Sequence, residues 1–177
     1  LEMEIEPAVS GTDAKFRKAI LATVKTALSS ARQTLAGEFE IHNDGAVYVG
    51  RYAWIMDLLV SFIVAQAGRR FGLDGKKNRM AVVAVGGYGR GELAPFSDID
   101  ILFVMSETQA SAIEKTVEFS LYLLWDLGLK VGHATRTVRE TIDTAKADHT
   151  VLTGLLEMRK IAGHQQLYGQ LESAVAA

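Results

Sequence analysis

Two neighbouring blocks decide the fold of this chain: Val85-Gly86-Gly87-Tyr88-Gly89-Arg90-Gly91-Glu92-Leu93 and Ser97-Asp98-Ile99-Asp100. The apolar run from Met80 to Val85 predicts a buried strand, and the glycines after it leave backbone N–H groups free. A second apolar strand, Ile101 to Val104, begins directly after the second block. Because side chains two positions apart on a strand project from the same face, we expect the two aspartate carboxylates to lie together.

Paired carboxylates beside a glycine-rich turn indicate a site that holds Mg²⁺ together with a phosphate chain. Asp98 and Asp100 are therefore the candidate metal-binding and catalytic residues. The candidates for nucleotide binding lie in the turn and shortly after it: Gly86, Gly87, Gly89, Arg90 and Ser97. This arrangement is typical of a nucleotidyl-transfer site.

A purely structural interpretation of the same residues stays open. The glycines can serve only a tight turn, with Arg90 paired to Glu92 and Asp98 acting as a turn residue. Asp100 would then need neutralisation by Arg90 or Lys130, because an unpaired carboxylate inside an apolar strand is costly to desolvate.

Two other phosphate-binding motifs are excluded by the residues of the turn. Gly86 and Gly91 have the glycine spacing of a Walker A loop, but Glu92 occupies the position of its lysine. Gly87 and Gly89 fit the dinucleotide fingerprint, but its third glycine comes one residue early.

The overall composition disfavours a nucleic-acid-binding protein and excludes a protein held together by disulfides or thiolate zinc sites. The 177 residues are 49% hydrophobic and 23% charged with a net charge of −2, which disfavours nucleic acid as a partner. The absence of cysteine excludes disulfides and thiolate zinc sites and favours the cytoplasm. The most apolar stretch, Leu58 to Ala65, is too short to span a bilayer, and we see no signal peptide. Because the chain begins Leu1-Glu2, we expect a piece of a longer protein.

The apolar spacing and the turn residues predict an α/β fold with a small mixed sheet, flanked by helices on one side. A helical N-terminal annex is expected over residues 1–78 and the core with its C-terminal helices over 79–177. The expected helices and strands, in chain order, are helices at 13–36 (ended by Gly37) and 47–71, a loop at 73–79, strands at 80–86 and 99–105 with one short helical turn between them, a helix at 106–127 opened by Ser106 and Gln109 and ended by Gly128, a strand at 129–135, and helices at 138–147 (capped by Thr137 and Glu140), 151–162 and 165–175.

The segment from Gly86 to Leu102 resembles the signature of bacterial PII uridylyltransferases, which belong to the DNA-polymerase-β-like nucleotidyltransferase superfamily. Leu124 to Thr137 and Leu155 to Arg159 resemble the same family, so the likeness covers roughly residues 80–163. Glutamine synthetase adenylyltransferases share a related motif, but the sequence Gly-Tyr-Gly-Arg-Gly-Glu-Leu favours the uridylyltransferases.

This resemblance implies Mg²⁺-dependent transfer of UMP from UTP to a tyrosine of the PII signal protein. It implies that Asp98 and Asp100 hold the catalytic metal ions, and that Gly86 and Gly87 lie where the superfamily binds the β- and γ-phosphates. It also implies the polymerase-β-like fold.

Two departures from the family pattern are visible. The third carboxylate that the superfamily usually supplies from a later strand is absent from Leu129 to Thr135. His133 is either a base or a structural hydrogen-bonding residue, and Glu157 is expected to pair with Arg159 or Lys160. No His-Asp dipeptide occurs, so the hydrolase domain and the glutamine-sensing domains of full-length family members are not encoded here.

Three functions stay open: uridylyl transfer to PII, a nucleotide-binding module without catalysis, and adenylyl transfer to glutamine synthetase. Nothing in the residues decides the oligomeric state.

Overall fold

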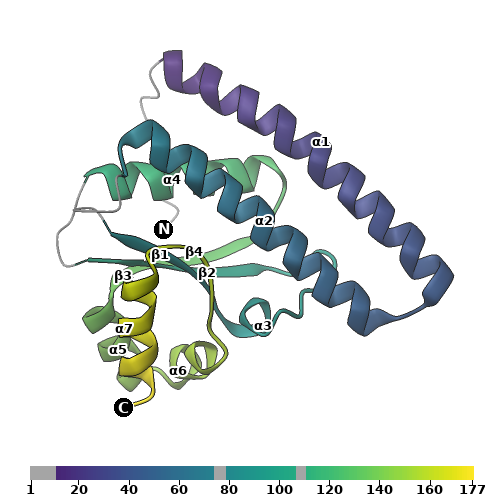
Figure 1. The fold of residues 1–177 in the computed structure, drawn as a ribbon. Helices are drawn as coiled ribbons and strands as arrows, with labels where there is room; N and C mark the ends of the chain where they lie inside the picture. The colour runs from purple at the N-terminus through teal and green to yellow at the C-terminus, as the bar shows by residue number, and fades with distance from the viewer. Residues whose placement is uncertain (1–10, 74–78, 107–110) are drawn as a thin grey trace, which may run out of the picture.

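The computed structural model describes residues 11–73, 79–106 and 111–177. The predicted loop at 73–79 falls mostly on 74–78, and Gln109 of the predicted capping pair falls on 107–110, so both predictions lie outside the described residues. In chain order the elements are α1 (Gly11–His42), α2 (Gly45–Phe71), β1 (Met80–Ala84), α3 (Gly86–Gly89), β2 (Ile99–Met105), α4 (Ser111–Asp126), β3 (Val131–Thr137), α5 (Val138–Ala147), α6 (His149–Leu156), β4 (Arg159–Gly163) and α7 (Gln165–Val175) (Figure 1).

The four strands form one mixed sheet in the order β3-β2-β1-β4. β1 runs antiparallel to β2 and to β4, whereas β2 and β3 are parallel, with Asp100 opposite Gly132. The predicted α/β class and the mixed sheet are therefore confirmed. The register matters for the site, because it places the first residues of β2 beside the first residues of β3.

Helices cover both faces of the sheet, so the prediction of helices on one side is wrong. Alternate residues of β1 and β2 point to opposite faces. Val82 and Phe103 pack with α1, α2 and α4, whereas Val83 and Leu102 pack with α5, α6 and α7. In Figure 1, α2 and α4 lie above the sheet and α5, α6 and α7 lie below it. The β1 and β2 strands are almost entirely buried because both faces are covered.

The first two helices form a long hairpin. α2 is capped by Asp44, whose carboxylate accepts a hydrogen bond of 3.0 Å from the Val47 N–H, and it ends at Gly72 with φ 75°, as predicted. α1 does not stop at Gly37 but continues to His42. The last turns of α1 pack on α2, where the ring centroids of Phe39 and Tyr48 are 5.4 Å apart. This packing outweighs the low helix propensity of Gly37.

The segment predicted as a helix at 151–162 is instead a shorter helix followed by a strand. Asp148 caps α6, which ends at Leu156, and residues 159–163 pair with β1 as an edge strand. The free edge of β1 provides hydrogen-bond partners that the local sequence does not reveal. The strand predicted at 129–135 lies two residues later, at Val131–Thr137.

Other predicted boundaries are confirmed. Thr137 and Glu140 form a capping box at the start of α5, and Gly128, with φ 74°, follows the end of α4. α7 spans the predicted range. The division into an annex over 1–78 and a core over 79–177 stays a prediction.

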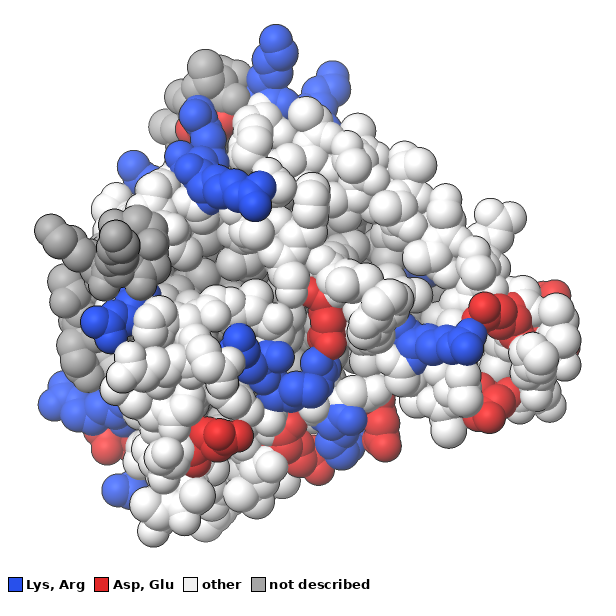
Figure 2. Space-filling view, in the orientation of Figure 1, with Lys and Arg blue, Asp and Glu red and all other residues white. Residues whose placement is uncertain are grey.

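One helix in the described part of the chain, α2, is long and apolar enough by length and composition to cross a bilayer. Nine of its residues are buried, and it packs against α1, α4 and β4, as a core helix does. Figure 2 shows basic and acidic groups adjoining one another on the same face, without a broad region of one sign. This face therefore offers no extended basic surface.

Candidate functional site

A cavity of about 390 Å³ opens between the sheet and the helices α5 and α6. It is lined from one side by the end of β1, the start of α3 and the neighbouring strands β2 and β3. The lining residues are Val85, Gly86, Asp100, Ile101, Leu102, Gly132, His133, Ala134, Arg136, Thr141, Asp148, Thr150, Val151, Gly154 and Leu155. Of the residues singled out from the sequence for the site, Gly86 and Asp100 line this cavity directly. Gly87, Gly89, Arg90, Ser97 and Asp98 are not among its lining residues.

The Asp100 carboxylate lies between two glycines from other elements. Its Oδ1 is 2.2 Å from the position that a Cβ at Gly132 would occupy, and its Oδ2 is 3.8 Å from the corresponding position at Gly86. The Val85 N–H donates a 3.1 Å hydrogen bond to the Asp100 carbonyl, which joins the end of β1 to the start of β2. The two glycines thus make room for a carboxylate at the mouth of the cavity.

Asp98 precedes β2 and is exposed to solvent. Its carboxylate lies 3.9 Å from Lys130 Nζ, and the two side chains are 65% and 75% exposed. A pair so exposed is weak and exchanges readily for another cation. Partial burial, and after it the charge of Asp98, raise the pKa of Asp100. A divalent cation placed between the two carboxylates would offset the repulsion that Asp100 experiences from the charge of Asp98.

The two carboxylates suit a hard divalent cation such as Mg²⁺, which takes oxygen ligands and keeps waters or phosphate oxygens in its other positions. Among the residues that the structure describes, no group of three or more histidine, aspartate and glutamate side chains could hold a metal ion. Asp148 also lines the cavity, but it does not form such a group with Asp98 and Asp100. The donor set fits a metal that arrives with a nucleotide, because the phosphates would complete its coordination.

His133 does not have the position expected of a base. Its neighbour Gly132 faces the Asp100 carboxylate, and residues next to one another on a strand point to opposite faces. The His133 ring packs edge-on against Trp125 of α4, with the centroids 5.9 Å apart. Its side chain therefore lies on the α4 face of the sheet, away from α5 and α6.

The glycine turn forms a four-residue helix, α3, directly after β1. Gly86 has φ 57°, a left-handed conformation that favours glycine, and the first N–H groups of any helix lack intrahelical partners. No side chain caps this helix at its start. These N–H groups are therefore available to an anion beside Asp100.

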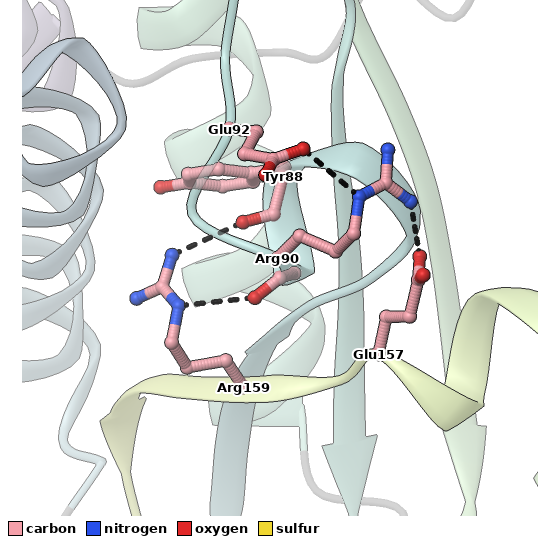
Figure 3. A network of polar contacts seen from close by, with 6 residues as sticks. Tyr88, Arg90, Glu92, Glu157 and Arg159 are labelled. Atoms are coloured by element: carbon pink, nitrogen blue, oxygen red, sulfur yellow. Dashed lines mark hydrogen bonds and ion pairs between the residues drawn. The ribbon is translucent and has the colours of Figure 1, made fainter. Parts of the chain in front are cut away.

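Arg90 pairs with two carboxylates in this structure (Figure 3). Its Nε donates a 3.2 Å hydrogen bond to Glu92, and its Nη1 donates a short one to Glu157. The pairing of Arg90 with Glu92, which the structural interpretation expected, is therefore observed. The expected pairing of Glu157 with Arg159 or Lys160 is wrong, because Glu157 pairs with Arg90. Arg90 Nη2 lies 3.5 Å from the position of a Cβ at Gly87, so the guanidinium is also beside the turn.

Gly89 serves close packing. A Cβ at this position would lie 2.2 Å from the Glu157 carbonyl oxygen and 3.1 Å from the Ala84 carbonyl oxygen. The absence of a side chain lets α3 approach the link between α6 and β4. Ser97 is exposed in the turn before β2, where its N–H donates to the Ala94 carbonyl over 3.1 Å.

Sequence reasoning missed four polar residues of the cavity wall, namely Arg136, Thr141, Asp148 and Thr150. Arg136 shares the cavity face of β3 with Gly132 and, among the described residues, makes no ion pair. Asp148 accepts a 2.8 Å hydrogen bond from the Thr150 N–H, and such bonds lower the pKa of Asp148. The alternation of side chains along β3 could have identified Arg136, because it lies four residues after Gly132 and therefore on the same face. Asp148 and Thr150 line the cavity only because of where α6 packs.

Comparison with known proteins matches residues 73–149 to the family described as "Nucleotidyltransferase domain". Residues 73–149 are therefore similar to a nucleotidyltransferase domain. The match runs from the end of α2 to the start of α6 and includes Asp98, Asp100 and the whole glycine turn.

The chain is also similar to curated proteins named bifunctional uridylyltransferase/uridylyl-removing enzyme. It is 40% identical to the protein of Rhodopseudomonas palustris and 41% identical to that of a Bradyrhizobium species, each over 92% of this chain. The protein of Azospirillum brasilense is 39% identical over 96% of this chain. These relatives confirm the resemblance expected from the motifs. The chain spans 18% of the length of each of them.

Among solved structures, one described as "Crystal structure of the toxin-antitoxin with AMP-PNP" aligns with a TM-score of 0.37 at 17% identity. The alignment covers 62% of this chain and 82% of that chain.

Proposed function

We propose that this nucleotidyltransferase domain transfers UMP from Mg²⁺-bound UTP to a tyrosine hydroxyl of the PII signal protein and releases pyrophosphate. The observation that supports this most is the Asp100 carboxylate at the cavity mouth, beside Gly86 and near Asp98. The similarity to uridylyltransferases supports UTP as the donor, and the sequence resemblance to PII uridylyltransferases supports PII as the acceptor. A cytoplasmic location is part of the same proposal.

The proposed roles follow from where the residues lie. Asp98 and Asp100 would hold the metal, which when bound neutralises negative charge on the α-phosphate and on the departing pyrophosphate. The N–H groups of Gly86 and Gly87 would bind terminal phosphate oxygens at the start of α3. Arg90, beside Gly87, and Arg136, in the cavity wall, would add charge-assisted hydrogen bonds to the phosphates.

The proposal is tested by following transfer from UTP labelled at the α-phosphate to purified PII, with Mg²⁺ and with EDTA. Asp98→Asn and Asp100→Asn should each reduce transfer by about 100-fold or more, because charge neutralisation by a metal is worth several kcal/mol. Asp126→Asn is the matched control, because Asp126 pairs with Arg17 between α1 and α4. Transfer that survives both substitutions, or that EDTA leaves intact, would contradict the assignment.

A nucleotide-binding module without catalysis is the second candidate. Among the described residues no third carboxylate joins Asp98 and Asp100 in a group that could hold a metal ion, and this favours the module, because the superfamily usually uses a third carboxylate to orient or deprotonate the acceptor. Binding of UTP and Mg²⁺ without pyrophosphate release, with PII present, would support the module. Adenylyl transfer to glutamine synthetase is the remaining alternative, and labelled ATP used in place of UTP distinguishes it.

A further inference from the structure

We propose that Arg159, at the start of β4, is a positioning residue that holds the glycine turn in its phosphate-binding conformation. The inference rests on the proposed function, since it assigns how the turn of that same site is kept in place. Neither the match to the nucleotidyltransferase family, which ends at residue 149, nor the predicted metal site includes Arg159.

The turn needs an external support. α3 has four residues, and so short a helix is unstable alone because nucleation costs more than its few hydrogen bonds return. Two of these residues are glycines that favour no single conformation, and a third, Gly89, is packed against the Glu157 backbone. The conformation of the turn is therefore decided by what packs around it.

Arg159 supplies hydrogen bonds to the C-terminal end of α3 (Figure 3). Its Nε donates to the Gly89 carbonyl over 3.2 Å, and its Nη2 donates to the Tyr88 carbonyl over 3.1 Å. The Tyr88 carbonyl also accepts a 3.1 Å hydrogen bond from the Gly91 N–H, so Arg159 adds a second donor at the end of the helix where carbonyl groups commonly lack intrahelical partners. A cation at this end of the helix is electrostatically favourable, and it leaves the N–H groups at the other end, beside Asp100, free for an anion.

The other side of the same guanidinium is fixed by α2. Arg159 Nη1 lies 2.5 Å from Asp57 Oδ2, and Nη2 lies 3.2 Å from Asp57 Oδ1, which is a two-pronged contact. The guanidinium carbon also lies 5.7 Å from the centroid of the Tyr88 ring. Arg159 thus joins α2, α3 and β4 at one point.

Tyr88 anchors the turn from beneath. Its side chain is 1% exposed, and burial, with the charge of Asp57 next in importance, raises the pKa of its hydroxyl well above the usual range. The ring therefore stays neutral and buried while Arg159 holds the backbone carbonyls of the turn. The planar guanidinium of Arg159 donates from three separate nitrogens to two carbonyls and a carboxylate, whereas lysine would offer donors from a single nitrogen.

The test compares Arg159→Lys with the wild-type chain by calorimetric titration with UTP and Mg²⁺, by steady-state transfer to PII, and by NMR of protein labelled with ¹⁵N-glycine. We expect the dissociation constant and KM for UTP to rise about tenfold, with a smaller change in kcat. The amide signals of Gly86, Gly87 and Gly89 should shift or broaden, and that of Gly45 should not.

Arg17→Lys is the matched control, because Arg17 also binds a carboxylate through two nitrogens, at 2.8 Å and 2.5 Å from Asp126 Oδ2, but between α1 and α4. It should leave UTP binding and the signals of the turn unchanged. Asp57→Asn is the second variant if Arg159→Lys does not fold, and it should move the same glycine signals to a smaller extent.

An Arg159→Lys protein that binds UTP like the wild type and keeps the glycine signals of the turn would overturn the inference. A wild-type chain that binds no UTP would instead overturn the proposed function, and the glycine signals would still report whether Arg159 holds the turn.

Discussion

The Asp100 carboxylate lies directly opposite Gly132 on the parallel neighbour strand, and its Oδ1 occupies the space that a Cβ at position 132 would need. The lack of a side chain at one position thus orients the acidic group at the other. The close approach also explains why a glycine is present inside β3, where it otherwise weakens a strand.

Gly132→Ala should therefore displace the Asp100 carboxylate without unfolding the chain. The atom in the way is the end of an aspartate side chain, which can rotate, so we expect the melting temperature to stay within about 2 °C of wild type. Transfer from UTP should fall about tenfold or more, with weaker Mg²⁺ dependence. Gly169→Ala on α7, where a Cβ meets nothing within 4 Å, is the control. An unchanged transfer rate in Gly132→Ala would show that Asp100 does not need its present orientation.

Asp100→Asn should make the metal-free protein slightly more stable at neutral pH. Because the pKa of Asp100 is raised in the folded state, the folded chain prefers the protonated carboxyl. That preference stabilises the fold below the ordinary aspartate pKa and is lost as the pH rises through the raised pKa. Removing the charge should raise the melting temperature at pH 7 by about 1 °C, and the gain should vanish near pH 3. A lower melting temperature at pH 7 would contradict this.

Arg136→Gln should weaken the binding of UTP more than it slows transfer. Arg136 is half-buried and lines the cavity, and within the described residues it makes no ion pair, although its charge acts on Glu140, so we expect it to contact a phosphate oxygen. We expect KM for UTP to rise about fivefold to tenfold, measured by initial rates across UTP concentrations. Arg139→Gln, an exposed cation on α5, should change KM little, and equal effects of the two substitutions would argue for a non-specific loss of positive charge.

Two glycine-to-alanine substitutions should have opposite effects on the free energy of unfolding. Gly89→Ala should lower it by about 2 kcal/mol or more, because the added Cβ meets backbone oxygens of Glu157 and Ala84 that cannot move alone. Gly37→Ala should raise it by about 0.5–1 kcal/mol, because the glycine lies inside α1 with nothing within 4 Å of a Cβ. Urea denaturation measures both, and a stable Gly89→Ala protein would mean that α3 can move away from the α6–β4 link.

Much of the core, and the glycines and aspartates of the candidate site, could be predicted from the sequence. The strands β1 and β2 are short, apolar and adjacent. The glycines and Asp98 lie between these strands and Asp100 lies at the start of β2, so local patterns were enough to place them. The Thr137–Glu140 cap and the helix ends at Gly72 and Gly128 were readable for the same reason.

The tertiary structure alone decided the contacts between distant segments. The residues that form β4 read as the continuation of a helix, and they become a strand because the free edge of β1 needs hydrogen-bond partners. The same pairing brings Arg159 to the carbonyl of Gly89, 70 positions earlier, and Glu157 to Arg90. Local periodicity reports how a segment folds by itself, but which distant segment completes its hydrogen bonds and charges is set only when the layers pack.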